Sequence, residues 1–391
     1  MSLHEAGMNT TLSLLGTPLA ELRHALHRSP ELSGQEAATA ACIAGWMEEA
    51  GAEVVSGLGG HGLAAIFRGA EPGPRVMLRC ELDALPIDEA PRGDWSSCHP
   101  HVGHLCGHDG HMSWMLGVAQ RLAASPVARG EVVLLFQPAE ETGEGARAVV
   151  RSKAFAALKP DYLYSCHNLP GRPLGEVSVR DHAFTCASRG MIVRLSGLCA
   201  HAAHPENGRS PAMAMCRIMQ GLSRLPLQFA DETGLAMVTL IHARLGEVAF
   251  GTSPGDAEVM VTLRTESDDM MKALAEAAVS LARSEAEEDR LGIDVDWCDT
   301  FDATWNSPEA NDMIRRVARQ QGLDCVELPQ AHRWSEDFGV LARDCHAAMF
   351  TFGAGEEMPG LHHPDYDFPD TLLAPGVEIF EGLVRQHLGR E

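Results

Sequence analysis

The chain has 391 residues, which is enough for one large domain or two ordinary ones, and 45% of them are hydrophobic, as in a globular protein. Its formal net charge of -23 argues against nucleic acid as a partner, because phosphates would be repelled over most of the surface. The sequence has no run of about 18 apolar residues, so a membrane span is not expected.

The first 184 residues alternate between helix-like and strand-like patterns. Helices are predicted at 21–33, 36–51 and 112–125, and strands at 62–67, 75–80 and 131–138. The last of these strands is apolar on both faces, which is typical of a sheet that helices cover on each side. We therefore expect an α/β domain built on a mostly parallel sheet.

From about residue 185 the pattern changes to longer strands and fewer helices. Strands are predicted at 190–197, 234–246, 256–265 and 292–298, and helices at 210–225 and 268–288. The resulting β-α-β-β-α-β order is that of a ferredoxin-like split βαβ unit. We expect residues 185–298 to form an inserted α+β domain.

After residue 300 the alternation of the first segment returns. A helix is predicted at 307–322 and a strand at 346–353, followed by a loop and a final helix. These signals predict that 299–391 joins 1–184 in one discontinuous α/β domain.

The stretch GHLCGHDGH, residues 103–111, is dense in side chains that bind metals. Cys106 and His108 are two positions apart, so in an extended segment both side chains point to the same side. Thiolate and imidazole are good ligands for zinc-like divalent ions. Because a Cys-x-His pair alone also fits a surface loop, its meaning depends on the rest of the chain.

Two adjacent carboxylates, Glu140 and Glu141, directly follow the apolar strand 131–138. The carboxyl edge of an α/β sheet is where binding sites tend to lie. Burying two carboxylates together without a cation is costly. One of the pair is therefore expected to bind metal while its neighbour faces a water molecule; a solvated loop is the alternative.

Two distant histidines lie in similar contexts. His167 ends a short apolar strand, and His362 lies in a loop rich in Gly, Pro and Asp. Either alone is commonly a structural residue. Together with Cys106, His108 and Glu141 they supply sulfur, nitrogen and oxygen donors, too many for one tetrahedral ion. Two ions that share a bridging water fit this set better, and such pairs are common in hydrolases.

Ordered motifs run nearly from end to end of the chain. They are LRHALHRSPELSGQE (22–36), LRCELDALPIDE (78–89), CGHDGH (106–111), FQPAEE (136–141), HNLPG (167–171), GLCAHAAHPENG (197–208), SEDF (335–338) and GLHHPDYDF (360–368). In these motifs the chain resembles the dinuclear-metal aminoacylase/carboxypeptidase family. Within that family it is most similar to the amidohydrolase branch, which includes hippurate hydrolases and plant indole-acetyl-amino-acid hydrolases.

This resemblance implies a role for each candidate residue. The ligands of two divalent metal ions (Zn, Mn, Co or Ni) would be Cys106, His108, Glu141, His167 and His362. Glu140 would be the general base, taking a proton from water and returning it to the departing amine. The inserted domain would be a lid that often mediates dimerisation, so a homodimer is expected.

Three further residues receive roles by the same resemblance. His201, in the inserted domain, would stabilise the oxyanion, and packing at a strand end is the alternative. Asp83 and Asp109 would orient metal-binding histidines. For Asp109 a helix N-cap is a second interpretation, since a helix is predicted to follow it.

The chain departs from the family pattern in the inserted domain. Many relatives carry Asn-Val-Ile-Pro, which helps to hold the carboxylate of the substrate, where this chain has Gly-Thr-Ser-Pro at 251–254. The Asn amide is lost, whereas Thr252 and Ser253 offer hydroxyl groups, and Arg209 or Arg264 would contribute charge. His363 also replaces a small polar residue beside His362. The change at 251–254 affects recognition of a free α-carboxylate, whereas His363 would affect the metal pocket.

The sequence therefore predicts a metal-dependent amidohydrolase acting on a small N-acyl amino acid or a related amide. One alternative is a dinuclear dipeptidase or carboxypeptidase, and another is a catalytically silent metal- or ligand-binding protein on the same scaffold. The eleven cysteines form no regular framework, and the N-terminus lacks the pattern of a signal peptide. A cytoplasmic location is expected, with no nucleic-acid or membrane partner.

Overall fold

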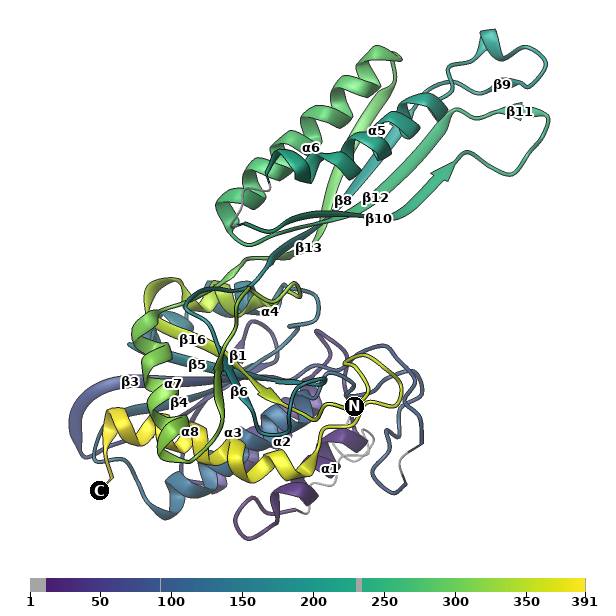
Figure 1. The fold of residues 1–391 in the computed structure, drawn as a ribbon. Coiled ribbons are helices and arrows are strands. Elements are labelled where there is room, and N and C mark those ends of the chain that lie inside the picture. The colour runs from purple at the N-terminus through teal and green to yellow at the C-terminus, as the bar shows by residue number, and fades with distance from the viewer. Residues whose placement is uncertain (1–11, 92, 230–233, 391) are drawn as a thin grey trace. The chain divides into compact units, whose positions relative to one another are not determined.

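The computed structural model describes residues 12–91, 93–229 and 234–390. The chain divides into two compact units, which Figure 1 shows as ribbons. The first unit comprises the described residues of Met1–Phe184, Thr304–Gln330 and Asp337–Glu391, and the second those of Thr185–Ala303 and Ala331–Glu336. The second unit is thus an insertion in the first.

An eight-stranded sheet forms the middle of the first unit, in the order β1-β2-β4-β3-β5-β16-β6-β15. Its strands are β1 (Glu53–Leu58), β2 (Gly62–Arg68), β3 (Glu71–Glu81), β4 (Arg129–Gln137), β5 (Tyr162–Leu169), β6 (Val177–Val179), β15 (Cys325–Glu327) and β16 (His346–Gly353). The central strands β4, β3, β5 and β16 are parallel neighbours, whereas β1, β2 and β6 form antiparallel pairs. The predicted mostly parallel sheet is confirmed.

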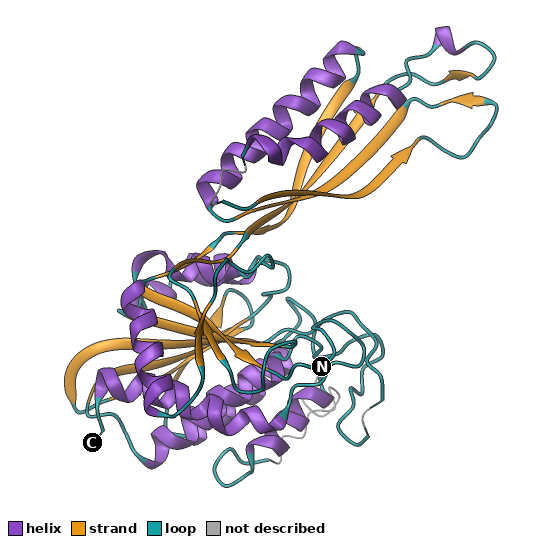
Figure 2. Ribbon diagram, in the orientation of Figure 1, coloured by secondary structure: helices purple, strands orange, loops and turns teal. Residues whose placement is uncertain are grey.

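Helices cover this sheet, as Figure 2 shows. They are α1 (Leu19–Arg28), α2 (Ala37–Glu49), α3 (His108–Ala124), α4 (Gly145–Arg151), α7 (Pro308–Gln320) and α8 (Leu373–Leu388). Consecutive residues of the central strands, such as Met77 and Leu78, are both fully buried, because successive side chains point to opposite covered faces. This double burial is the reason for the continuous apolar runs in the sequence.

The first unit differs from the sequence prediction in several details, and the short elements α4, β6 and β15 were not predicted. The helix predicted at 21–33 ends at Arg28, because Pro30 disfavours the helical conformation of Ser29, whose ψ is 58°. Strand β1 was not predicted; it lies at the sheet edge and only Leu58 in it is buried, so it lacks an apolar run. The short strands β7 (His182–Thr185) and β14 (Thr304–Asn306) form a separate two-stranded sheet.

The second unit has the predicted β-α-β-β-α-β order. Its elements are β8 (Ala187–Ser196), α5 (Ala212–Arg224), β10 (Ala236–Leu245), β12 (Asp256–Thr265), α6 (Asp268–Glu288) and β13 (Gly292–Phe301). The strands form an antiparallel sheet in the order β10-β12-β8-β13, with α5 and α6 on one face (Figure 1). The ferredoxin-like arrangement is confirmed. Of the helices that the structure describes, none combines the length and the apolar character needed to cross a membrane.

Candidate metal centre

The candidate site lies where strands of the first unit end. Strands β3, β4 and β5 are parallel neighbours, so their carboxyl ends meet at one edge of the sheet. Asp83 follows β3, Glu140 and Glu141 follow β4, and His167 lies near the end of β5. Helix α3 begins at His108. Parallel pairing therefore brings segments together that are far apart in the sequence.

Of the five clusters of donor atoms found among the described residues, each within 4.8 Å, three consist entirely of predicted ligands and the predicted base. They are Cys106–His108–His167, Cys106–Glu141–His362 and His108–Glu140–Glu141. Cys106 Sγ lies 3.4 Å from His167 Nε2. Glu141 Oε1 lies 3.8 Å from His108 Nε2 and 3.7 Å from His362 Nε2. The structure thus brings the five predicted ligands together with the predicted base.

The geometry of His108 fits a bound cation. Its ring is fully buried, and Nδ1 lies 2.8 Å from the Asp83 carbonyl oxygen, to which it donates. The second ring nitrogen, Nε2, is buried and makes no hydrogen bond to any residue in the described ranges. A buried polar atom without a partner is uncommon in proteins. In metal-binding histidines one ring nitrogen usually donates a hydrogen bond and the other binds the metal. In His108, Nδ1 makes the hydrogen bond, which leaves Nε2, beside Glu141, for a metal.

The protonation of the cluster would change if a cation were bound. Burial, together with the Glu141 and Glu140 carboxylates, raises the pKa of the Cys106 thiol well above its usual value. Burial lowers the pKa of His108, but the hydrogen bond to Asp83 and the surrounding carboxylates outweigh burial and raise it to about 10. Metal binding would release these protons, because metals bind thiolate and neutral imidazole. The residues present therefore fit a divalent cation.

Two backbone positions at the site are strained. Ala139, directly before Glu140, has φ 51°, and His362 has φ 65°, both in the left-handed region that disfavours residues with a Cβ. Such strain costs on the order of 1–3 kcal/mol and is commonly found at functional sites. The buried Glu36 holds the backbone at Ala139, since Glu36 Oε1 accepts a 2.8 Å hydrogen bond from Ala139 N. Glu36 is the last residue of the motif at 22–36, but no role was predicted for it.

The two predicted orienting carboxylates have different partners. Asp83 contacts His108, and its Oδ2 accepts hydrogen bonds from Ser33 Oγ at 2.7 Å and Glu141 N at 3.0 Å. Asp109 instead lies 2.9 Å from both Arg23 Nη1 and His27 Nδ1, so it joins α3 to α1. The N-cap interpretation of Asp109 is wrong, because α3 starts one residue earlier, at His108.

His27 should give the protein a pH-dependent stability. Burial lowers its pKa, but the Asp109 charge and the hydrogen bonds to Asp109 and Glu89 outweigh burial and raise it from 6.5 to about 9. Because the folded-state pKa is the higher one, the stabilisation is complete below pH 6.5 and is lost as the pH rises through about 9.

The expected result is that the free energy of unfolding of the wild type falls over this pH range by more than that of His27→Gln. Urea denaturation of both proteins at about pH 6 and about pH 10 measures the difference. Parallel pH profiles of the two proteins would contradict the assignment.

A buried ion network that was not predicted lies around Arg79 in β3, although Arg79, Glu81 and Asp337 belong to the motifs at 78–89 and 335–338. Arg79 Nη2 donates to Asp337 Oδ1 at 2.8 Å, Nε donates to Gln137 Oε1 at 2.9 Å, and Nη1 pairs with Glu81. Glu81 Oε2 in turn lies 2.7 Å from His111 Nδ1. The network ties β3 to β4 and α3, which carry the candidate ligands. The available signal was a charged residue within an apolar strand, since buried Arg is rare unless paired.

The predicted substrate-binding residues gather in the second unit. Strand β9 (Ala200–His201) pairs with β11 (Thr252–Ser253), with Thr252 opposite His201 and Ser253 opposite Ala200. Arg209 forms an isolated antiparallel β-bridge with Leu198, which lies two residues before β9 in the sequence. His201, Thr252 and Arg209 are exposed. The structure thus brings these four predicted residues into one region of the second unit.

Comparison with known proteins gives consistent matches over nearly the whole chain. The model of peptidase family M20/M25/M40 matches residues 77–386. Hippurate hydrolase of Campylobacter jejuni is 27% identical over 370 residues, covering 94% of this chain and 96% of that protein. N-acetyldiaminopimelate deacetylase of a Geobacillus species is 27% identical over 369 residues, with coverage of 93% and 96%.

A solved structure shares the fold. The YXEP protein of Bacillus subtilis, described as a dinuclear metal binding peptidase from the M20 family, superposes with a TM-score of 0.80 at 25% identity. The match covers 95% of this chain and 97% of that one. The resemblance drawn from the motifs is confirmed. The chain belongs to peptidase family M20/M25/M40 and is a hydrolase of amide C–N bonds.

Proposed function

We propose that this chain is a metal-dependent amidohydrolase that cleaves a small N-acyl amino acid or a related amide. The observation that carries the proposal is the gathering of five donor residues and one further carboxylate, from distant segments, at one edge of the sheet. The names of the relatives, a hippurate hydrolase and an N-acetyldiaminopimelate deacetylase, support N-acyl amino acids as the substrate class.

Two divalent metal ions (zinc, manganese, cobalt or nickel) are the proposed cofactors. Their proposed ligands are Cys106, His108, Glu141, His167 and His362. These residues offer more donors than one tetrahedral ion takes, which supports a pair of ions. When bound, such ions polarise an amide carbonyl and make hydroxide available near neutral pH. The mixed thiolate, imidazole and carboxylate set suits borderline metals of this kind.

Glu140 is the proposed general base. Its side chain is buried, and a carboxylate oxygen lies within 4.8 Å of donor atoms of His108 and Glu141. Glu140 would accept a proton from the water that attacks the amide carbonyl. The same carboxyl group would then return that proton to the departing amine nitrogen.

Residues of the second unit are the proposed contacts of the substrate. The exposed imidazole of His201 would donate a hydrogen bond to the amide oxygen as that oxygen gains negative charge. Thr252 and Ser253 would bind polar groups of the substrate through their hydroxyls. Arg209 would pair with a carboxylate, which a guanidinium matches in shape.

A substrate panel tests the proposed function. The panel contains N-acetyl and N-benzoyl amino acids and dipeptides, each assayed with added Mn²⁺, Zn²⁺, Co²⁺ or Ni²⁺. Turnover of the N-acyl amino acids is expected. Turnover of dipeptides alone would instead identify a peptidase. No turnover on any compound, with metal demonstrably bound, would favour a silent binding protein; the buried Glu140 beside the donors argues against that outcome, since a structural site needs no spare carboxylate.

Asn168 should control metal affinity through its contacts. Its Nδ2 donates to the Cys106 carbonyl at 2.8 Å and lies 3.0 Å from His111 Nε2, while the Tyr366 hydroxyl donates to its Oδ1. The expected result for Asn168→Leu is a loss of about 10–100-fold in metal affinity, because the segment that carries Cys106 is no longer held. Titration against a competing chelator measures it. The exposed Asn207→Leu is the matched control, and equal affinities in the two variants would refute this role.

A homodimer through the second unit is the proposed assembly. Strand β10 is an edge of the four-stranded sheet, and Leu240 and Ile241 on it are exposed. An exposed apolar edge strand readily pairs with another chain. The expected result is a dimer for the wild type and a monomer for Ile241→Lys in size-exclusion chromatography with light scattering. Leu174→Lys, at an exposed site of the first unit, should remain dimeric; a monomeric wild type would contradict the proposal.

A cytoplasmic location is also proposed. All eleven cysteines are free, and several of them are buried. Free cysteines in this number are typical of a reducing compartment, where Cys behaves as a small apolar residue.

A further inference from the structure

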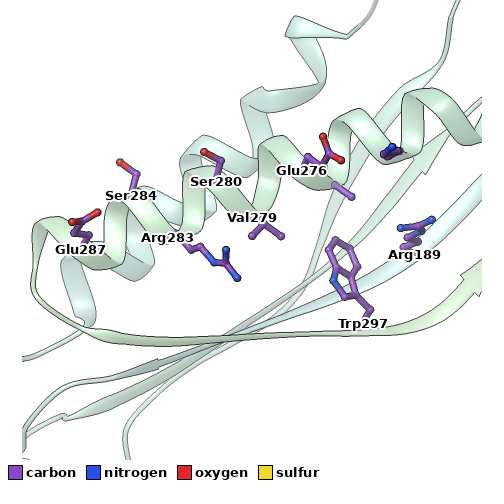
Figure 3. Close-up of a pocket in the computed structure, with 10 residues that line it drawn as sticks. Arg189, Glu276, Val279, Ser280, Arg283, Ser284, Glu287 and Trp297 are labelled. Atoms are coloured by element: carbon purple, nitrogen blue, oxygen red, sulfur yellow. The ribbon is translucent and has the colours of Figure 1, made fainter.

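A groove of about 670 Å³ lies within the second unit, between α6 and the strands β8 and β13 (Figure 3). This volume is within the range of small-molecule sites. The lining residues that matter for its chemistry are Arg189, Lys272, Val279, Arg283 and Trp297. None of them belongs to the candidate metal centre or to the proposed substrate contacts.

The groove arises from the way α6 packs on the sheet. The helix turns small buried side chains, including Ala275, Ala278 and Ala282, towards the strands. β13 lies at the edge of the sheet opposite β10, and Trp297 on it remains 38% exposed. The indole ring of Trp297 is thus left accessible beside the part of α6 where these small side chains lie.

The cations of the groove have no carboxylate partner. Within the part of the chain that the structure describes, Arg189, Lys272 and Arg283 form no ion pair, although the chain has a net charge of -23. Arg189 Nε is also buried and makes no hydrogen bond to a described residue. A buried charged donor without an acceptor is unfavourable, so the site lacks an acceptor that a ligand would supply.

The side chains of the groove converge on one space. In Figure 3, Val279 and Arg283 project from α6 towards the strands, and Trp297 projects from β13 towards α6, near Arg189. Glu287, which also lines the groove, points away from the strands. Glu276 of α6 lines the groove as well, but among the described residues neither glutamate forms an ion pair with Arg189, Lys272 or Arg283. The guanidinium groups and the indole face are therefore left for a ligand.

We propose that this groove is a binding site for a small planar aromatic anion. The guanidinium groups of Arg189 and Arg283 would hold its anionic group, because their fork geometry matches carboxylate and phosphate oxygens. The aromatic ring would lie on Trp297 by offset stacking. An aryl carboxylate and a nucleoside monophosphate share this chemistry. The volume of the groove favours a molecule of that size over an extended peptide.

Calorimetric titration of the metal-loaded full chain tests the site. The probes are naphthoate for the carboxylate and AMP for the phosphate, each compared with its uncharged counterpart, naphthamide or adenosine. At least one anion is expected to bind, and its uncharged counterpart to bind about tenfold more weakly. Binding of naphthoate alone identifies an aryl carboxylate site, and binding of AMP identifies a nucleoside phosphate site. Binding of neither anion overturns the proposal.

Variants separate the groove from the metal centre. Arg189→Gln, Arg283→Gln and Trp297→Ala should each weaken the binding of the anion roughly tenfold, and Trp297→Phe should retain most of it. Arg316→Gln, which removes an exposed charge from α7, is the matched control and should bind normally. Glu140→Gln should also bind normally. If Arg189→Gln does not fold, the exposed Arg283→Gln gives the same test. Normal binding in the groove variants overturns the proposal.

Discussion

Glu140→Gln is expected to lose turnover by about 10⁴-fold while retaining its metal ions. General acid–base catalysis contributes on the order of 10²–10⁴-fold, and here one carboxylate would serve as both base and acid. Glutamine has nearly the same shape, but its amide cannot accept the proton of the attacking water. Turnover numbers on the best substrate of the panel, together with the metal content per chain, measure the two effects separately.

The matched control for this variant lies in the same loop. Glu144→Gln makes the same chemical change at an exposed position and should leave turnover unchanged. Full activity of Glu140→Gln would remove Glu140 from the role of base. Loss of metal in that variant would mean that Glu140 is a ligand instead.

His362→Ala is expected to lose at least one metal ion and nearly all activity. His362 Nε2 lies 3.7 Å from Glu141 Oε1, and the backbone of His362, with φ 65°, is held by a 2.8 Å hydrogen bond from its N to the Leu105 carbonyl oxygen. Removing a ligand leaves an incomplete donor set, so metal affinity should fall by roughly 100-fold or more. Metal analysis after equilibration with a chelator buffer measures the change.

The neighbouring histidine supplies the control for this second variant. His363 Nδ1 lies 3.6 Å from Asp365 Oδ2 and is half exposed, so His363→Ala should keep both metal and activity. In the wild type, chelation should abolish turnover reversibly, and the ion that restores it best would identify the metal. The ligand assignment fails if His362→Ala binds metal as tightly as His363→Ala does.

Local patterns in the sequence were enough to predict most of the long elements and the candidate donor residues. The apolar run at 131–138 predicted a doubly covered strand, and β4 is one. The order of elements at 185–298 predicted the ferredoxin-like sheet. Cys106 and Glu141 were recognisable because their chemistry and their positions beside regular elements are properties of short segments. Periodicity and donor type are local, so one sequence suffices to reveal them.

Only the tertiary structure decided which charged groups meet. Arg79 and Asp337 are 258 positions apart, yet they form a 2.8 Å ion pair, and no short pattern signals such a pairing. The same holds for Asp109, which contacts α1 and does not cap α3. Arg189 and Arg283, 94 positions apart, line the same groove of the second unit because α6 packs on the sheet. Helices, strands and reactive side chains are determined by the sequence because they depend on residues close together in the chain. Ion pairs between residues far apart in the chain depend on how the helices and strands pack.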